Sequence, residues 1–378
     1  MSPPKKVLLL CEFPTLHGGE RSQLSIVPRL STLGFQFVAC APDDGALTVA
    51  LHDLAVPVSP FDREVTLELR RRCVRDAIEQ RQPDLVHANG LNIGRVAGPV
   101  AAEMGVPLVT HLRDIVGLSR QAVTDLNQST RLVAVSEATR AAHVAQGLRH
   151  DRVVVIRNGV DLERFHPARE TAAWRAGLGI APGDLVIGAV GQIIRRKGFD
   201  TLASAAAALE AKRQKLGTSG SLHWVIVGER HSRKEEAIEF DRQLRDDFHR
   251  AVGPRAHFLG TRADVDELLR GFDLFVHPSR QEPLGRVLLE AAATVLPIVA
   301  TDVGGTREIF PAGEAAFTPA NDPQALGAAI EKLIASRELR AALGAAARRR
   351  VETAFTLEQA AVATARVYDE CLESGHGG

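Results

Sequence analysis

The sequence predicts an α/β protein made of two doubly wound parallel-sheet domains. Its 378 residues exceed what one compact core usually holds and suit two domains of roughly 100 to 200 residues each. Short apolar runs alternate with helical stretches along the whole chain, which is the pattern of parallel sheets built from right-handed βαβ units. A turn-rich segment at residues 157–167 separates two series of these runs.

The strands that we predict follow in chain order. Those of the first half are residues 6–11, 35–41, 85–88, 108–111, 132–135 and 153–156. Those of the second half are residues 185–190, 224–227, 257–259, 274–277 and 298–300. Between the halves, Asn158-Gly159 and Pro167 are typical of turns and linkers. We therefore predict an N-terminal domain of residues 1–165 and a C-terminal domain of residues 166–355.

Composition excludes several classes of protein. The 46 basic and 46 acidic residues cancel, so no global field favours nucleic acid, and an anion site must be built locally. The four cysteines are scattered without metal-type pairing, which favours a reducing compartment. No apolar run approaches the ~18 residues that span a bilayer, and we read no signal peptide. We expect a cytoplasmic protein.

The densest chemical signal lies at residues 275–305, which read as strand, loop, helix, strand and glycine turn. A loop that leads from a parallel strand into a helix presents free N–H groups and the positive end of the helix dipole, where phosphate binds. Gly285 permits close approach of a ligand, and Arg286 adds charge. Glu290 can reach a ribose diol, and Glu282 is free to bind a sugar. In isolation the two glutamates would more often be a solvated helix face.

This segment resembles glycosyltransferase family 4, the retaining "glycosyl transferases group 1" with the GT-B fold of two Rossmann-like domains. The family pattern S-x-x-E-x-x-G-x-x-x-x-E-A with a following G-G turn is met at Ser279, Glu282, Gly285, Glu290, Ala291, Gly304 and Gly305. The resemblance extends over nearly the whole chain. It implies that a C-terminal helix at about residues 356–378 packs back onto the N-terminal domain, which faces the acceptor, while residues 166–355 bind the donor.

Further motifs resemble the family's donor site. Gly18-Gly19 matches its glycine loop, although alone the pair suggests an ordinary turn. His111 stands in the strand-end histidine motif and would bind the transferred sugar. Lys197 occupies the lysine position of the phosphate-clamping loop, but Gln192 stands where the family usually has arginine, and Arg195 or Arg196 could supply that charge. The resemblance thus implies catalytic roles for His111, Lys197 and Glu282. It implies donor contacts by Gly18, Gly19, Gln192, Arg196, Lys197, Leu284, Gly285, Arg286 and Glu290.

The acceptor site is less defined. Candidates at the ends of two N-terminal strands are His87, Asn89, Arg113 and Asp114. Packing or turn roles explain His87 and Asn89 equally well, and Arg113 and Asp114 could instead orient His111. Basic clusters at residues 70–75 and 348–350 read first as solvated helix faces. The alternative is a weak peripheral contact with the inner face of a membrane. The sequence says nothing about oligomeric state.

The resemblance implies transfer of a hexose-type sugar from a nucleotide diphosphate donor to a hydroxyl of a glycan, lipid or small-molecule acceptor, with retention of configuration. UDP-sugars are favoured as donors and GDP-mannose is second. We expect no metal or other cofactor, since Asp264-Val-Asp266 opens a helix and reads as a cap rather than a metal motif.

Two other classes stay open. One is a sugar-nucleotide epimerase or hydrolase of related fold, and the other is a non-catalytic nucleotide-sugar-binding protein. A nicotinamide oxidoreductase is remote because the first glycine loop does not match GxGxxG.

Overall fold

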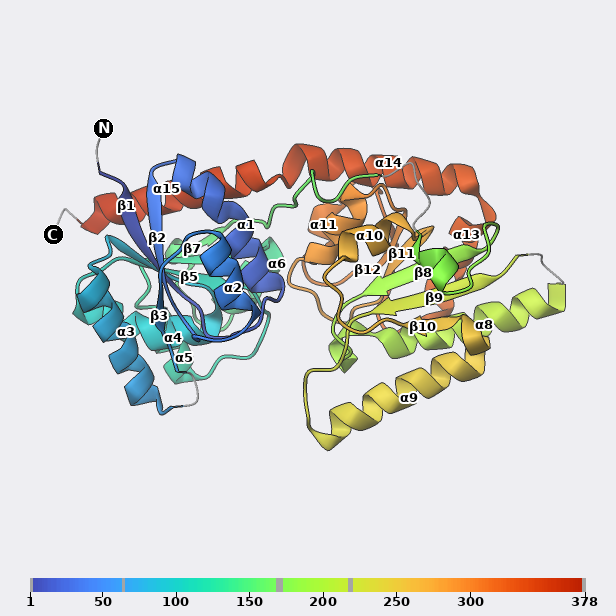
Figure 1. The fold of residues 1–378 in the computed structure, drawn as a ribbon, viewed down its shortest axis with the longest axis horizontal. Helices are drawn as coiled ribbons and strands as arrows, with labels where there is room; N and C mark the ends of the chain where they lie inside the picture. Colours follow the sequence, from blue (N-terminus) through green and yellow to red (C-terminus); the bar gives the residue numbers. More distant parts are fainter. Residues whose placement is uncertain (1–2, 63–64, 168–172, 217–219, 376–378) are drawn as a thin grey trace. The chain divides into compact units, whose positions relative to one another are not determined.

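The computed structural model describes residues 3–62, 65–167, 173–216 and 220–375. The chain divides into two compact units. Unit 1 is Met1–Gly159 with Phe355–Gly378, and unit 2 is Val160–Ala354. The first division falls a few residues before the predicted boundary at 165. Each unit contains a parallel sheet with helices on both faces (Figure 1).

In unit 1 the described residues form a parallel sheet of seven strands in the order β3-β2-β1-β4-β5-β6-β7. The strands are β1 (Lys5–Leu10), β2 (Phe35–Ala41), β3 (Val58–Pro60), β4 (Leu85–Ala88), β5 (Leu108–Leu112), β6 (Arg131–Ala134) and β7 (Val153–Val155). The strand order reverses between β1 and β4, where Leu10 pairs with Ala88. In open α/β sheets such a reversal leaves a crevice at the carboxyl ends of the strands, and ligands bind there.

The helices of unit 1 cover both faces of this sheet because its strands are apolar on both sides. Val7 and Leu9 pack with one hydrophobic cluster, while Leu8 and Leu10 pack with another. The first cluster includes residues of α1 (Gly18–Thr32), α2 (Ala46–Asp53) and α15 (Leu357–Gly375). The second includes α3 (Leu67–Arg81) and α4 (Leu91–Glu103). Beyond them lie α5 (Arg120–Leu126) and α6 (Glu137–Val144).

Helix α15 belongs to the core of unit 1 although it is the last helix of the chain. Tyr368 is fully buried, and Cys371 and Leu372 lie in the same cluster as strand β1. Burial of a large apolar side chain contributes about 1.5–3 kcal/mol, so these residues anchor the helix firmly. Residues 376–378 of the predicted C-terminal helix lie outside the described residues.

In unit 2 the described residues form a parallel sheet of six strands in the order β10-β9-β8-β11-β12-β13. The strands are β8 (Leu185–Val190), β9 (Leu222–Val227), β10 (Ala256–Phe258), β11 (Leu274–His277), β12 (Ile298–Thr301) and β13 (Ala316–Thr318). Helices α8 (Phe199–Leu216), α9 (Glu235–Val252) and α13 (Pro323–Ala335) share one hydrophobic cluster with the sheet. Helices α11 (Arg286–Ala293) and α14 (Arg337–Ala354) also contact β12.

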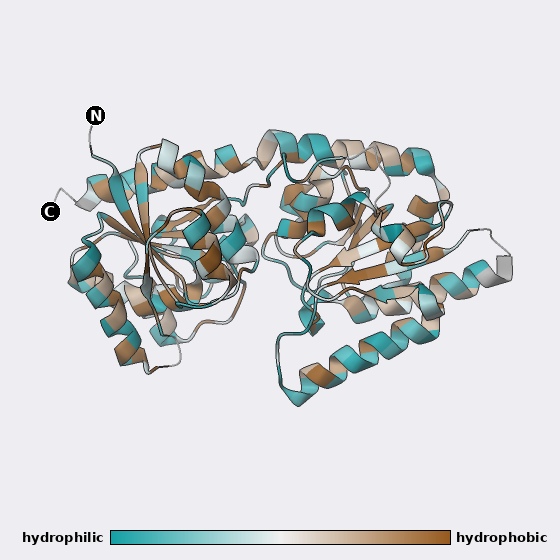
Figure 2. Ribbon diagram, viewed as in Figure 1, coloured by the Kyte–Doolittle hydropathy of each residue, from teal (hydrophilic) through white to brown (hydrophobic). Residues whose placement is uncertain are grey.

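Hydropathy follows this layering. Figure 2 shows brown, apolar strands inside each unit and a largely teal, hydrophilic α9. Strands β3 and β13 were not among the predicted strands. Their residues are Val58-Ser59-Pro60 and Ala316-Phe317-Thr318, so neither carries the apolar run that marks the equally short edge strand β7, Val153-Val154-Val155.

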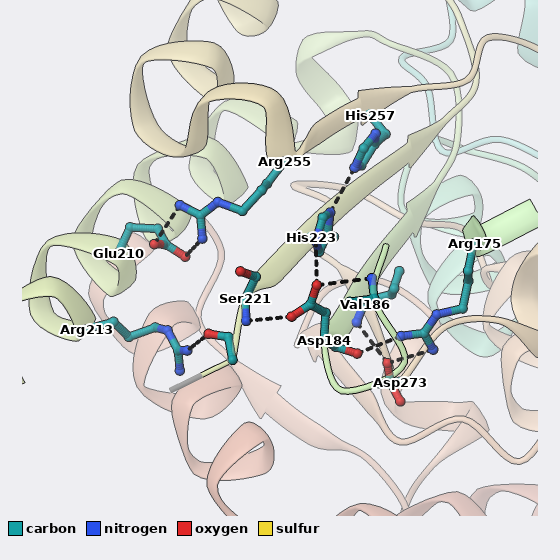
Figure 3. A network of polar contacts seen from close by, with 12 residues as sticks. Arg175, Asp184, Val186, Glu210, Arg213, Ser221, His223, Arg255, His257 and Asp273 are labelled. Carbon is teal, nitrogen blue, oxygen red and sulfur yellow. Dashed lines mark hydrogen bonds and ion pairs between the residues drawn. The ribbon is translucent and has the colours of Figure 1, made fainter. Parts of the chain in front are cut away.

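A polar network closes the amino end of the unit 2 sheet (Figure 3). Asp184 accepts hydrogen bonds from the Ser221 backbone N–H (2.8 Å) and lies 3.2 Å from His223 Nε2. His223 Nδ1 in turn lies 3.0 Å from His257 Nε2. This network holds the starts of β8, β9 and β10 together, which leaves the carboxyl ends of the strands to form the loops described next.

Candidate active site

The centre of the unit 2 site is the buried carboxylate of Glu282, in the loop after β11. Its Oε2 atom lies 2.5 Å from Lys197 Nζ and 2.8 Å from His277 Nε2. The Ser279 hydroxyl donates to the same oxygen at 3.3 Å. Lys197 reaches it from the 3-10 helix η2 (Arg195–Lys197), after the neighbouring strand β8. Among the described residues nothing hydrogen-bonds to the second oxygen, Oε1, which leaves it available to a ligand.

Electrostatics keep this carboxylate charged. Burial acts to raise the pKa of Glu282, but the Lys197 ammonium and the hydrogen bond to His277 outweigh it and hold the pKa well below its ordinary value. Burial lowers the pKa of His277 despite the carboxylate beside it. A neutral His277 therefore donates its Nε2–H to Glu282. Sequence reasoning assigned no role to His277, although a histidine ending a buried apolar strand requires a partner.

Two glycines hold the backbone of this site in place. Gly198 has φ +67°, and a Cβ there would lie 1.9 Å from the Pro278 carbonyl oxygen. Gly304 has φ +54°, and its Cβ would lie 1.9 Å from the Glu282 carbonyl oxygen. The Gly305 N–H donates to that same oxygen at 3.0 Å. The G-G turn of the sequence motif thus fixes the backbone that carries Glu282, and only glycine fits at Gly304.

The start of α11 carries the other predicted donor residues. Gly285 precedes the helix at φ +100°, and Leu284 beside it is buried. Arg286 Nε lies 2.9 Å from Glu290 Oε1, so the glutamate predicted to reach a ribose forms an ion pair within its own helix. Each of the two cations, Lys197 and Arg286, therefore stands against a carboxylate.

The loop after β8 carries Arg195 and Arg196, either of which could supply the charge of the arginine that the family usually has at the position of Gln192. Their side chains lie in different surroundings. The guanidinium of Arg195 lies over the Phe240 ring at 5.0 Å, toward α9. Arg196 makes no ion pair among the residues that the structure describes, and its charge acts on the pKa of His277. Arg280, also close by, is committed to Asp200 through two contacts of 2.8 Å. Arg196 is therefore the arginine of this loop that is available to a phosphate.

The predicted residues of unit 1 meet around Arg113, which follows β5. Its guanidinium donates to Asn89 Oδ1 from Nε (2.9 Å) and Nη2 (2.7 Å). Nη2 also lies 3.1 Å from His111 Nδ1. Two residues that the sequence did not suggest complete the set, with contacts of 3.3 Å each to Asn158 Oδ1 and Gln23 Oε1. Asn89 and His111 are both more than nine-tenths buried.

Behind this group, His87 contacts the last helix of the chain. His87 Nδ1 lies 2.6 Å from the Tyr368 hydroxyl on α15. Burial, with a smaller effect of Arg113, lowers the pKa of His87 to about 3. The same two causes, with His87 as a third, hold the pKa of His111 well below its ordinary value. Both imidazoles are therefore neutral at physiological pH.

The remaining predicted residues of unit 1 are Gly18, Gly19 and Asp114. Gly18 and Gly19 begin helix α1 and do not form a loop. A Cβ on Gly19 would lie 2.8 Å from Arg113 Cδ, so this glycine makes room for the arginine. The side chain of Asp114 is exposed, and its backbone carbonyl accepts a hydrogen bond from His143 Nε2 at 2.8 Å.

Two further predictions need correction. Asp264 stands at the start of α10 (Val265–Arg270), but its carboxylate pairs with Arg262 and does not cap the helix. The basic cluster at residues 348–350 is not simply a solvated face, because Arg348 donates to the Phe165 carbonyl (2.8 Å) and Arg350 to the Ile309 carbonyl (2.9 Å). In the cluster at residues 70–75, Arg75 pairs with Glu103 at 2.6 Å.

The described residues include neither a metal-binding group nor a membrane span. Among them, no three His, Cys, Asp or Glu side chains are grouped so that they could hold a metal ion. Within the same ranges, every helix is too short or too polar to cross a membrane. Metal independence stays a prediction.

Comparison with known proteins gives matches over both units. The sequence model of the family described as "Glycosyltransferase Family 4" matches residues 16–164, and that of "Glycosyl transferases group 1" matches residues 170–350. A D-inositol 3-phosphate glycosyltransferase of Kineococcus radiotolerans is 30% identical over 325 residues, 78% of this chain and 73% of that enzyme.

Two further matches are a mannosyltransferase and a solved structure that contains UDP and glucose. The lipopolysaccharide core biosynthesis mannosyltransferase LpsB of Rhizobium meliloti is 31% identical over 222 residues, which are 58% of this chain and 61% of that enzyme. The crystal structure of Anabaena Alr3699/HepE in complex with UDP and glucose superposes with a TM-score of 0.84 at 25% identity, covering 97% of this chain and 99% of that one.

Proposed function

The chain belongs to the group 1 glycosyltransferases of family 4, with two Rossmann-like domains of the GT-B class, and we propose that it transfers a hexose-type sugar from a nucleotide diphosphate sugar to a hydroxyl acceptor. The acceptor is a glycan, a lipid or a small molecule. The family resemblance implies that the anomeric configuration is retained.

The observation that carries this proposal is the carboxylate of Glu282, of which one oxygen is hydrogen-bonded and the other is not among the described residues. One of its oxygens accepts from Lys197, His277 and Ser279, whereas the other has no hydrogen bond among the described residues. A rigid, ionised carboxylate with one free oxygen suits a sugar hydroxyl, which donates one hydrogen bond. Its position between the β8 loop and the start of α11 puts that sugar beside groups that suit phosphate.

Charge stabilisation of the leaving diphosphate is the main catalytic task in this proposal. Lys197 and Arg286 each stand against a carboxylate, so these two pairs add no net positive charge. We assign the additional charge to Arg196, together with the N-terminal N–H groups of α11 and the adjacent Gly285. Gln192 offers an amide at the position where the family usually has arginine. One well-placed donor in such a site is worth about 3 kcal/mol.

In this proposal His111 binds the transferred sugar, as the family resemblance implies, and the acceptor candidates are His87, Asn89, Arg113 and Asp114. No side chain stands out as a covalent nucleophile. We therefore favour departure of the diphosphate and attack of the acceptor on the same face of the sugar, with the donor phosphate taking the proton of the acceptor hydroxyl. Metal independence is part of the proposal, and undiminished transfer in EDTA is the expected result.

We favour UDP-sugars as donors, with GDP-mannose second. The UDP complex of Alr3699/HepE supports the first and the similarity to a mannosyltransferase supports the second. A thermal-shift series with UDP, GDP, ADP and their sugars tests this directly, because a ligand that binds the folded state at 100 times its Kd adds about 2.7 kcal/mol of stability. Product analysis then separates the classes. Transfer to an acceptor supports the proposal, whereas an altered free sugar or donor hydrolysis alone would indicate an epimerase or hydrolase.

A further inference from the structure

The contact between Arg113 and His111 determines where the imidazole carries its proton. A guanidinium has only donors, so an Arg113 Nη2–H that lies 3.1 Å from His111 Nδ1 requires a lone pair on that nitrogen. The proton of the neutral ring must then be on Nε2. The same reasoning fixes the orientation of the Asn89 amide. Its Oδ1 accepts two N–H groups of Arg113, so its Nδ2 must point away from Arg113.

In this tautomer His111 Nε2–H is a hydrogen-bond donor without an acceptor among the described residues. His111 Nε2 is buried and has no hydrogen-bond partner among the described residues, and the same holds for Asn89 Nδ2. A buried donor left unpaired costs about 1–3 kcal/mol, so it is rarely retained unless a ligand completes it. Both donors belong to residues at the carboxyl ends of β4 and β5, next to the reversal of strand order where ligands bind.

The surroundings keep the ring uncharged. Among the described residues, the charged or titratable groups around it include Arg113 at Nδ1, His87 on the neighbouring strand with ring centroids 5.6 Å apart, and Tyr368 beside His87. Burial, Arg113 and His87 all act to lower the pKa of His111. A ring with this proton arrangement offers a hydrogen-bond donor to substrate and no basic nitrogen, because Nδ1 is occupied by Arg113.

We propose that Arg113 is a positioning residue that fixes His111 as its Nε2–H tautomer, so that His111 acts on the sugar as a hydrogen-bond donor and not as a base. The role toward the sugar rests on the proposed function, but the tautomer does not. Gly19 leaves the space that Arg113 occupies. The orientation of Arg113 is fixed by the acceptors Asn89, Asn158 and Gln23.

The first test is nitrogen-15 NMR of the histidine-labelled full chain, with the His111 signals identified by their absence in His111→Gln. We expect a protonated Nε2 and an unprotonated Nδ1 at His111, unchanged from about pH 8 to about pH 6. An Nδ1–H tautomer or a charged ring in that range would overturn the proposal. No donor is needed, so this result stands even if sugar transfer is never observed.

Arg113 is then replaced by methionine, and Arg71→Met serves as the matched control. Arg71 is also an arginine of unit 1 with a buried partner, Asp125 at 3.4 Å, but it makes no hydrogen bond to a strand-end histidine among the described residues. We expect Arg113→Met to give a mixture of tautomers, and Arg71→Met to keep the wild-type His111 signals. If circular dichroism shows Arg113→Met to be unfolded, Arg113→Leu, which also lacks a hydrogen-bond donor, replaces it. An unchanged tautomer in a folded Arg113 variant would contradict the assignment.

Sugar transfer provides the third readout. Glutamine can place an amide N–H near the position of His111 Nε2 but cannot act as a base, whereas alanine can do neither. We expect His111→Gln to retain at least about tenfold more kcat than His111→Ala, since one transition-state donor is worth roughly 10²–10³ in kcat. Equal losses in the two variants would indicate a base and overturn the donor role. Absence of transfer by the wild-type chain would instead count against the proposed function.

Discussion

The two units hold their buried cations in different ways. In unit 2, Lys197 is neutralised by the carboxylate of Glu282, so the geometry depends on opposite charges in a buried place. In unit 1, the guanidinium of Arg113 is gripped by four neutral acceptors, two asparagines, a glutamine and an imidazole. The ion pair holds Lys197 close to Glu282, whereas the several hydrogen bonds of Arg113 fix the orientation of its guanidinium and the tautomer of His111. The buried cation of unit 2 is therefore held by charge, and that of unit 1 by the directions of its hydrogen bonds.

The largest test of this difference is removal of the charge of Lys197. Lys197→Met leaves the buried Glu282 carboxylate without its cation, and breaking such a pair costs about 3–5 kcal/mol. We expect a marked loss of stability in urea unfolding along with a loss of donor turnover. Lys212→Met is the control, because its pair with Glu331 is exposed and should cost less than about 1 kcal/mol.

A second variant sharpens the result for unit 2. Lys197→Met combined with Glu282→Gln removes both charges, so much of the stability should return while turnover stays low. A double variant as unstable as Lys197→Met would mean that packing of the lysine stem, and not charge, holds this loop.

The buried, neutral His87 of unit 1 should make the stability of the chain depend on pH. His87 has a pKa of about 3 in the folded chain against about 6.5 when unfolded, so the unfolded state takes up the proton first as the pH falls. Its contribution therefore lowers stability below about pH 6.5 by about 1.4 kcal/mol per unit, about 2 kcal/mol at pH 5. Urea unfolding of His87→Gln should show a pH slope smaller by this amount. Identical slopes would place the titration elsewhere.

The smallest expected effect is that of Tyr368→Phe. It removes the hydroxyl that lies 2.6 Å from His87 Nδ1 and leaves the ring buried, so we expect a loss of about 1 kcal/mol. Thr364→Val is the control on the same helix, because that hydroxyl donates only to the Ala360 carbonyl among the described residues. A loss confined to Tyr368→Phe, measured by thermal unfolding, would tie α15 to the strand-end histidines. Equal losses would not.

Much of the fold follows from pattern, because long apolar strands such as β1 and β8 carry their own signal. The strands β3 and β13 do not, since each combines at most two apolar residues with serine, proline or threonine, whereas the equally short edge strand β7 consists of three valines. In the site, Glu282 and Lys197 stand in compact motifs, and the structure puts their side chains in contact as spacing alone could not show.

The network of Arg113 illustrates what sequence patterns miss. Its partners stand at Gln23, Asn89, His111 and Asn158, which are scattered over unit 1 with no common spacing. Only the strand order brings them to one end of the sheet. The pairing of Arg286 with Glu290 follows from helical spacing, yet the sequence could not show whether the glutamate turns to its neighbour or to a ligand.

The place of α15 in unit 1 has a consequence for the synthesis of the chain. Residues 1–159 leave the ribosome before unit 2 does, yet their core lacks Tyr368, Cys371 and Leu372 until α15 has been synthesised. Unit 2 is continuous in sequence and can complete its core while α15 is still being made. At about 5–20 residues per second, the unit that is synthesised first waits on the order of ten seconds or more for its final helix. The contact between Tyr368 and His87 therefore forms only after unit 2 has been synthesised.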